Sequence, residues 1–165
     1  MAEDVLYIGR RGPGRGDPSV VIETAGGELL GILPDFRRTG DASTIEWGYG
    51  GRGPTELARN MLLHALGEDA VCWRCRGNGY LRTRADPNAP KGYVVEPYDP
   101  GDEPEPDFRP LCDNHRGCNE GYLRMPTHAF VERFLLHLSR EPETEWRLSQ
   151  AEILQWLHSD GIAAL

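Results

Sequence analysis

Apolar residues at the start of the chain fall into short runs separated by turns. Three such runs occupy residues 5–8, 20–22 and 29–33. Runs of this length, rich in valine, isoleucine and leucine, predict β-strands. The Ala-Gly-Gly turn at 25–27 separates the second and third runs, so 19–33 predicts a β-hairpin that ends at Pro34. Residues 43–47 alternate between polar and apolar side chains and predict another short strand.

Apolar residues later in the chain recur at helical spacing. The first predicted helix begins near Pro54 and stops at Gly67. Its apolar face comprises Leu57, Ala58, Met61, Leu62, Ala65 and Leu66. A second helix is predicted from Thr127 as its N-cap, and its apolar stripe comprises Phe130, Val131, Phe134, Leu135 and Leu138. Ser149 and Glu152 have the spacing of a capping box and predict the start of a third helix.

These elements predict an α+β fold with a short antiparallel sheet and about three helices. They lie in 1–70 and 125–165, which we expect to form one discontinuous core. The residues between them, 71–124, are rich in glycine, proline and charge and are predicted to be an insert. Because long loops without structure of their own are uncommon in compact domains, this insert needs a staple.

Composition limits the size of the core and the class of partner. Only 39% of the residues are hydrophobic, and the chain has 20 glycines and 13 prolines, so the core is modest. The net charge of −8 argues against general nucleic-acid binding, which needs a clustered basic face. Residues 96–107 carry six acids and no base. We expect this segment to be a solvated loop; the alternative is a DNA-mimicking or base-seeking surface.

The cysteines predict a metal rather than disulfides. The acidic start of the chain does not resemble a secretory signal, and no apolar stretch approaches the ~18 residues that a membrane span needs. We therefore expect a cytoplasmic protein without a membrane segment. Four cysteines in such a chain favour metal binding.

All four cysteines lie in two similar runs, each with glycines followed by Tyr-Leu. The first run contains Cys72-x-x-Cys75, a tight turn that can place two sulfurs on one ion. The second run contains Cys112 and Cys118. Since zinc in structural sites takes four nitrogen or sulfur ligands, we predict one structural Zn²⁺ per chain, bound by these four cysteines.

The second run permits other ligand sets. Cys112 could pair with His115, or His115 with Cys118, and each choice leaves one cysteine unused. We favour the pair Cys112 and Cys118 because closed zinc sites prefer thiolates and an unused thiol is a liability. Two further readings are four unligated thiols and a catalytic zinc with Glu120 as its base; we favour the sealed structural site over both.

The order Cys-x-x-Cys-x-Gly-x-Gly at 72–79 resembles one zinc-binding repeat of the cysteine-rich domain of Hsp40-type chaperones. The resemblance covers about ten residues. It implies zinc and does not imply a chaperone function.

A glycine-rich loop precedes the first predicted helix. Its glycine spacing matches the Gly-x-Gly-x-x-Gly fingerprint of dinucleotide-binding folds. However, no second parallel strand follows the helix, and so no acidic residue ends such a strand. We therefore favour a structural turn. The alternative is a phosphate or nucleotide site made by loop amides and one guanidinium at a helix N-terminus. That site would use Gly48, Gly50, Gly51, Arg52 and Gly53.

Residues 45–58 resemble the signature of a family of small uncharacterised proteins from bacteriophages, plasmids and actinobacterial genomes. The family pattern is Trp-Gly-Tyr-Gly-Gly-Ser-Gly-Pro-x-x-Leu-Ala, and this chain has Arg52 where the family usually has serine. Segments 7–11 and 146–156 resemble its opening and closing motifs, so the similarity covers roughly 5–66 and 127–158. The resemblance implies a mobile-element origin and a shared α+β core, without a known activity. We expect most members to lack the cysteine lobe.

No catalytic constellation stands out, because the five histidines are scattered and the cysteines are assigned to metal. We predict a non-enzymatic interaction protein of phage or mobile-element type in the cytoplasm of a bacterial host cell. Its zinc-stapled acidic lobe would face a host or phage protein partner. The alternative from another class is a nucleotide-binding protein or enzyme that uses the glycine loop.

Overall fold

The computed structural model describes residues 4–13, 17–36, 45–77, 79–97, 111–113, 118–119 and 121–159. Two compact units make up the chain. Unit 1 consists of Met1–Leu66 and Met125–Leu165, and unit 2 consists of Gly67–Arg124.

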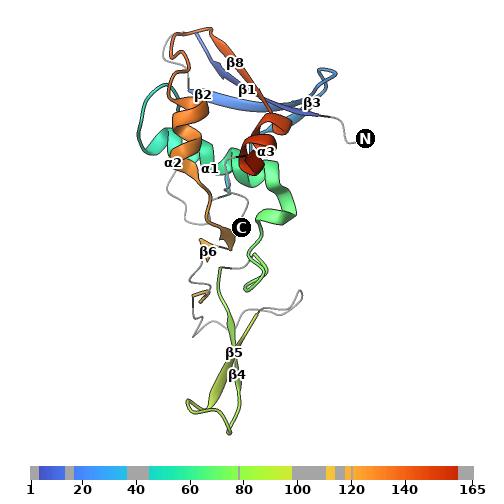
Figure 1. Ribbon diagram of the computed structural model, residues 1–165, viewed down its shortest axis with the longest axis vertical. Coiled ribbons are helices and arrows are strands. Elements are labelled where there is room, and N and C mark those ends of the chain that lie inside the picture. Colours follow the sequence, from blue (N-terminus) through green and yellow to red (C-terminus); the bar gives the residue numbers. More distant parts are fainter. Residues whose placement is uncertain are drawn as a thin grey trace. The chain divides into compact units, whose positions relative to one another are not determined.

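A four-stranded antiparallel sheet forms one layer of unit 1 (Figure 1). Its order is β3-β2-β1-β8, with the strands β1 (Val5–Arg11), β2 (Pro18–Thr24), β3 (Leu29–Ile32) and β8 (Glu145–Ser149). The predicted hairpin over 19–33 is confirmed as β2 and β3. Gly27 has a φ of 89° in the turn between them, a conformation that favours glycine.

Strand β8 was not predicted, because from the sequence Trp146–Leu148 directly precedes the capping box of the third helix and shows no strand signal of its own. In the structure this segment pairs antiparallel with β1. Trp146 and Leu148 are buried, whereas Glu145 and Arg147 alternate with them and are exposed. Gly9 lies opposite Trp146, and a Cβ at Gly9 would overlap the indole. Glycine on β1 therefore makes the room that Trp146 needs.

The predicted strand at 43–47 is wrong where the structure describes it. Residues 43 and 44 lie outside the described residues, and Ile45, Glu46 and Trp47 are not in a strand. Trp47 is fully buried, and its Nε1 donates a hydrogen bond to the Ser139 carbonyl at 2.9 Å. Its ring packs edge-on against Trp146 at a centroid separation of 5.4 Å. These tertiary contacts override the local alternation.

Helices cover one face of this sheet, so the α+β fold class is confirmed (Figure 1). They are α1 (Arg52–Leu66), α2 (Thr127–Phe130), which continues as the π-helical segment η2 (Val131–Leu135), and α3 (Gln150–Ser159). Gly67, with a φ of 56°, follows the end of α1 as predicted.

Of the N-caps predicted for the two later helices, one is confirmed and one is wrong. The capping box of α3 is confirmed: the Ser149 amide donates to Glu152 Oε2 at 2.9 Å, and the Glu152 amide donates to Ser149 Oγ at 3.1 Å. The prediction that Thr127 caps α2 is wrong. Pro126 occupies the cap position, with no side-chain hydrogen bond there, and Thr127 is already the first helical residue.

One hydrophobic core joins the sheet to the helices of unit 1. Its fully buried side chains come from β1, β2, α1, α2, η2, α3 and the segment before α1, and include Tyr7, Val20, Trp47, Leu57, Met61, Leu62, Phe130, Leu135 and Ile153. Burying a side chain of this size contributes roughly 1.5–3 kcal/mol. The predicted apolar faces of the helices therefore supply the stability of this unit.

Unit 2 has little regular structure. It contains the 3-10 helix η1 (Gly67–Ala70), the hairpin β4 (Arg82–Ala85) and β5 (Tyr93–Glu96), and the short pair β6 (Cys118–Asn119) and β7 (Tyr122–Leu123). Its buried apolar cluster among the described residues consists of Cys72, Cys75 and Leu81, with Val95 packed against it. A cluster this small cannot stabilise the unit by itself.

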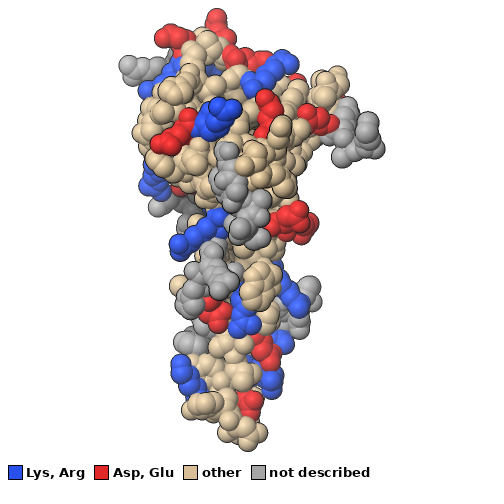
Figure 2. Space-filling view, viewed as in Figure 1, with Lys and Arg blue, Asp and Glu red and all other residues tan. Residues whose placement is uncertain are grey.

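On the face that Figure 2 shows, the described basic and acidic side chains are interspersed and not gathered by sign. The sheet carries three ion pairs among its described residues, one of them between Arg10 and Glu145 at 2.7 Å. Within the described parts of the chain, no helix combines the length and apolar character that crossing a membrane requires.

A part-buried hydrogen bond links β1 to α1. The Tyr7 hydroxyl lies 2.8 Å from Nδ1 of His64. Burial lowers the pKa of His64 below its ordinary value and raises the pKa of Tyr7. Because the unfolded chain then binds a proton that the folded chain does not, the free energy of unfolding should fall as the pH drops through about 6.5.

His64→Asn should flatten that pH dependence, since asparagine accepts the Tyr7 hydrogen bond without titrating. Urea unfolding between about pH 7.5 and about pH 5, followed by tryptophan fluorescence, measures the slope. His137→Asn is the matched control because His137 is exposed. An unchanged slope in His64→Asn would contradict this role of His64.

Candidate metal centre

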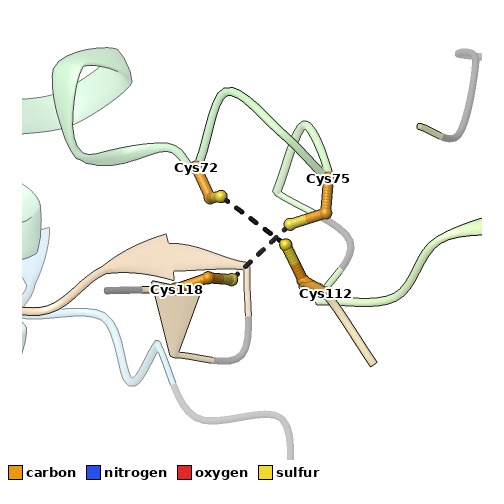
Figure 3. Close-up of side chains that lie close together, drawn as sticks. All are labelled: Cys72, Cys75, Cys112 and Cys118. Atoms are coloured by element: carbon orange, nitrogen blue, oxygen red, sulfur yellow. Dashed lines mark hydrogen bonds between the residues drawn. The ribbon is translucent and has the colours of Figure 1, made fainter. Parts of the chain in front are cut away.

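The four predicted cysteines come together in unit 2, and their thiols point toward one another (Figure 3). All four Sγ atoms lie within 4.8 Å of one another. Cys72 and Cys112 are 3.9 Å apart at sulfur, and Cys75 and Cys118 are 3.7 Å apart. A tetrahedron of sulfurs around zinc has edges of about 3.8 Å, since Zn–S is about 2.3 Å. The spacing therefore suits one tetrahedral ion.

Backbone hydrogen bonds tie the two cysteine runs to each other reciprocally. The Cys72 amide donates to the Gly121 carbonyl, and the Cys112 amide donates to the Gly79 carbonyl, each at 2.9 Å. β-bridges flank these bonds in the same reciprocal way, joining Val71 to Tyr122 and Tyr80 to Leu111. Each run therefore holds the first cysteine of the other, and neither turn is complete alone.

The same two glycines also contact the second cysteine of their own run. The Gly79 amide donates to Cys75 Sγ at 3.3 Å, and the Gly121 backbone hydrogen-bonds to Cys118. Cys112 and Cys118 thus occupy places equivalent to Cys72 and Cys75, although five residues separate the former pair and two the latter. Amides directed at sulfur stabilise the thiolate form that a metal binds.

Glycine is required where the runs meet. Gly121 has a φ of 99°, and a Cβ there would overlap the Gly77 backbone carbonyl. Gly77 itself has a φ of 83°. The glycines that follow the cysteines therefore let the two backbones approach each other closely.

Electrostatics at the site are compatible with a bound cation. Burial raises the pKa of Cys118, and the adjacent Cys75 and Cys72 raise it further, while the bond from Gly121 lowers it. Four thiolates this close repel one another without a positive charge between them, and a bound divalent cation reverses that penalty. Cys72 and Cys75 are buried, and Cys112 and Cys118 are half-buried, so protein encloses most of the sulfur cluster.

The ligand set itself stays a prediction. His115 and Glu120 lie outside the described residues, so the alternatives that use them are not tested. The structure brings together all four cysteines that the prediction named, and their donor set fits a closed tetrahedral metal site.

Two features of the site were not predicted from the sequence. Arg74 forms an ion pair with Asp113 at 2.9 Å, which links the two runs outside the sulfur cluster. Trp73 is 73% exposed between the two cysteines of the first turn. The Cys-x-x-Cys spacing could have predicted the exposure of Trp73. When both sulfurs of the turn point toward a shared ion, the two residues between the cysteines face the solvent.

The glycine loop before α1 packs against the end of η2 and the residues that follow it. The Gly48 amide donates to the Leu135 carbonyl at 2.8 Å, and a Cβ at Gly48 would overlap the Arg140 side chain. The Gly51 carbonyl accepts from both the amide and the hydroxyl of Thr55. These contacts give the loop a structural role. The anion site that would use Gly50, Arg52 and Gly53 as well stays a prediction.

Comparison with known proteins finds one family match, to part of the chain. Residues 7–76 match the model of a family of unknown function (DUF6166). No curated protein and no solved structure matches the chain. The DUF6166 match covers less than half of the chain and carries no activity with it. It runs past the expected limit at 66 to include Cys72 and Cys75, and it does not extend to 127–158.

Gly121→Ala should weaken metal binding by about 10–100-fold, because the methyl group separates the two runs that position the thiols. Competition with a chromophoric chelator measures the affinity. Gly92→Ala is the control: Gly92 also has a positive φ, 74°, but nothing lies near its Cβ position. Equal losses in both variants would show that backbone strain, and not the contact with Gly77, is responsible.

Proposed function

We propose that Cys72, Cys75, Cys112 and Cys118 bind one zinc ion in a closed structural site. The observation that carries the proposal is the approach of all four sulfurs to within 4.8 Å of one another. Tetrahedral sulfur sites suit zinc, which has no redox chemistry and no geometric preference that opposes this arrangement. In this role the ion replaces the hydrophobic core that unit 2 lacks.

We further propose that unit 2 presents an apolar surface to a protein partner, without catalysis. Trp73 is 73% exposed and Leu111 is 72% exposed, and each is next to a zinc ligand in the sequence. Tryptophan on a rigid turn loses little conformational entropy on binding and is a frequent anchor at interfaces. The acidic composition of residues 96–107 favours a partner that also carries basic groups.

The resemblance of residues 45–58 to proteins of phages and plasmids supports a mobile-element origin. In that setting the partner is a host or phage protein in the bacterial cytoplasm. The local resemblance of residues 72–79 to an Hsp40-type repeat supports zinc binding alone.

Elemental analysis of the purified protein should give about one zinc per chain. Cys72→Ser should lose the metal and unfold unit 2, while hydrogen exchange at β1 and β2 stays slow because unit 1 has its own core. Trp73→Ala is the matched control, since it changes an exposed neighbour of Cys72 and should keep the zinc. Wild-type protein that contains no zinc after expression with ample zinc would contradict the proposal.

Trp73→Ala should release the protein partner while the zinc content stays unchanged. Affinity capture from a bacterial lysate, compared quantitatively between variants, measures this loss. Lys91→Ala, in the exposed turn between β4 and β5, should capture the partner as well as the wild type does. A partner retained equally by all three proteins would show that Trp73 does not anchor the interface.

A further inference from the structure

The four cysteines of unit 2 form two close pairs, and each pair joins one run to the other (Figure 3). The Sγ atoms of Cys72 and Cys112 are 3.9 Å apart, and those of Cys75 and Cys118 are 3.7 Å apart. Because a disulfide bond is about 2.05 Å long, each pair has to close by less than about 2 Å to form one. Sulfurs held around one ion are therefore also positioned to react with each other once the ion leaves.

The two members of each pair differ in exposure. Cys112 and Cys118 of the second run are half-buried, whereas Cys72 and Cys75 of the first run are buried. A small oxidant in the solvent therefore reaches a sulfur of the second run first. A buried partner lies next to that sulfur and is shielded from the same oxidant. An accessible thiolate beside a resolving thiolate is the arrangement on which reversible thiol oxidation depends.

The backbone favours disulfides between the runs over disulfides within a run. The first cysteine of each run already hydrogen-bonds to a glycine of the opposite run at 2.9 Å. Bonds between the runs would join positions 40 and 43 apart, whereas Cys72 and Cys75 are only three apart. Cross-links that span more of the chain remove more entropy from the unfolded state. Disulfides between the runs are therefore the pairs that stabilise folded unit 2.

We propose that the metal centre is a redox switch, in which a hydroperoxide converts the zinc-bound thiolates into the disulfides Cys72–Cys112 and Cys75–Cys118 and releases the ion. This inference rests on the proposed zinc site and adds its regulation. In the reduced state the ion holds the two runs together. In the oxidised state two covalent bonds hold them in the same places.

The chemistry balances with one hydroperoxide for each disulfide. With hydrogen peroxide, the second-run thiolate attacks one oxygen, the O–O bond breaks, a sulfenic acid forms and hydroxide leaves. The first-run thiolate then attacks the sulfenic sulfur, forms the S–S bond and expels a second hydroxide. Each pair of thiolates gives two electrons to the peroxide, and the two hydroxides take up protons from the solvent. Two peroxides therefore consume all four thiolates and leave the zinc ion without ligands.

The switch predicts two zinc-free forms with different structures. A chelator under reducing conditions removes the ion and puts nothing in its place, whereas oxidation replaces the ion with two cross-links. Strand β5 reports the difference, because Val95 packs against the cluster that contains Cys72 and Cys75. Amides of β4 and β5 should stay protected from hydrogen exchange in the oxidised form. They should exchange at least about tenfold faster in the reduced, chelated form.

Titration of the zinc-loaded full chain with hydrogen peroxide tests the proposal. A metallochromic indicator should record about one zinc released per chain as the free thiols fall from four to none. Trypsin cleaves after Arg74, between the first two cysteines, and after Arg116, between the last two, so the peptides distinguish every pairing. Mass spectrometry should find both disulfides between the runs. Dithiothreitol with added zinc should restore the metal-bound form.

Zinc that stays bound while the thiols oxidise, disulfides within a run, or an oxidised form that exchanges as fast as the chelated one would overturn the switch. Each of these results leaves the zinc site itself intact, because the starting protein carries the metal. Wild-type protein that takes up no zinc would contradict the proposed function instead, and the switch with it.

Discussion

The arrangement of unit 2 depends on the reciprocal hydrogen bonds between its two cysteine runs. Gly121 and Gly79 each accept from the first cysteine of the opposite run and donate toward the second cysteine of their own. The four sulfurs converge because these bonds are satisfied together. Since the buried apolar cluster is so small, the proposed metal would supply much of the stability of this unit. Folding of this unit and metal binding would then be one equilibrium.

Unit 1 relies on a different principle, the packing of helices on a sheet. Trp146 over Gly9, and Trp47 edge-on against Trp146, connect β8, β1 and the segment before α1. Gly48 makes room for the chain after η2. The DUF6166 match over residues 7–76 includes Gly9, Trp47 and Gly48 but not Trp146, and it continues through Cys72 and Cys75.

Local signals predicted the elements that local chemistry decides. The hairpin, the start of α3 and the end of α1 follow from glycine turns, a capping box and Gly67. β8 was missed because pairing with β1 is a long-range contact, and the alternation in residues 45–47 was misread because Trp47 is held by tertiary contacts. For the candidate site, spacing sufficed to select four cysteines. The interlocking of the glycines could not be predicted, because it arises only when runs about 40 residues apart meet.

We propose that four thiolates, and no other group, hold one zinc ion. X-ray absorption at the zinc edge of the purified protein measures the ligands directly. Four cysteine ligands should give a single shell of four sulfurs at about 2.3 Å. A shell that contains a nitrogen or oxygen ligand at about 2.0 Å would assign one position to His115 or water, and would contradict the equivalence of the two cysteine runs.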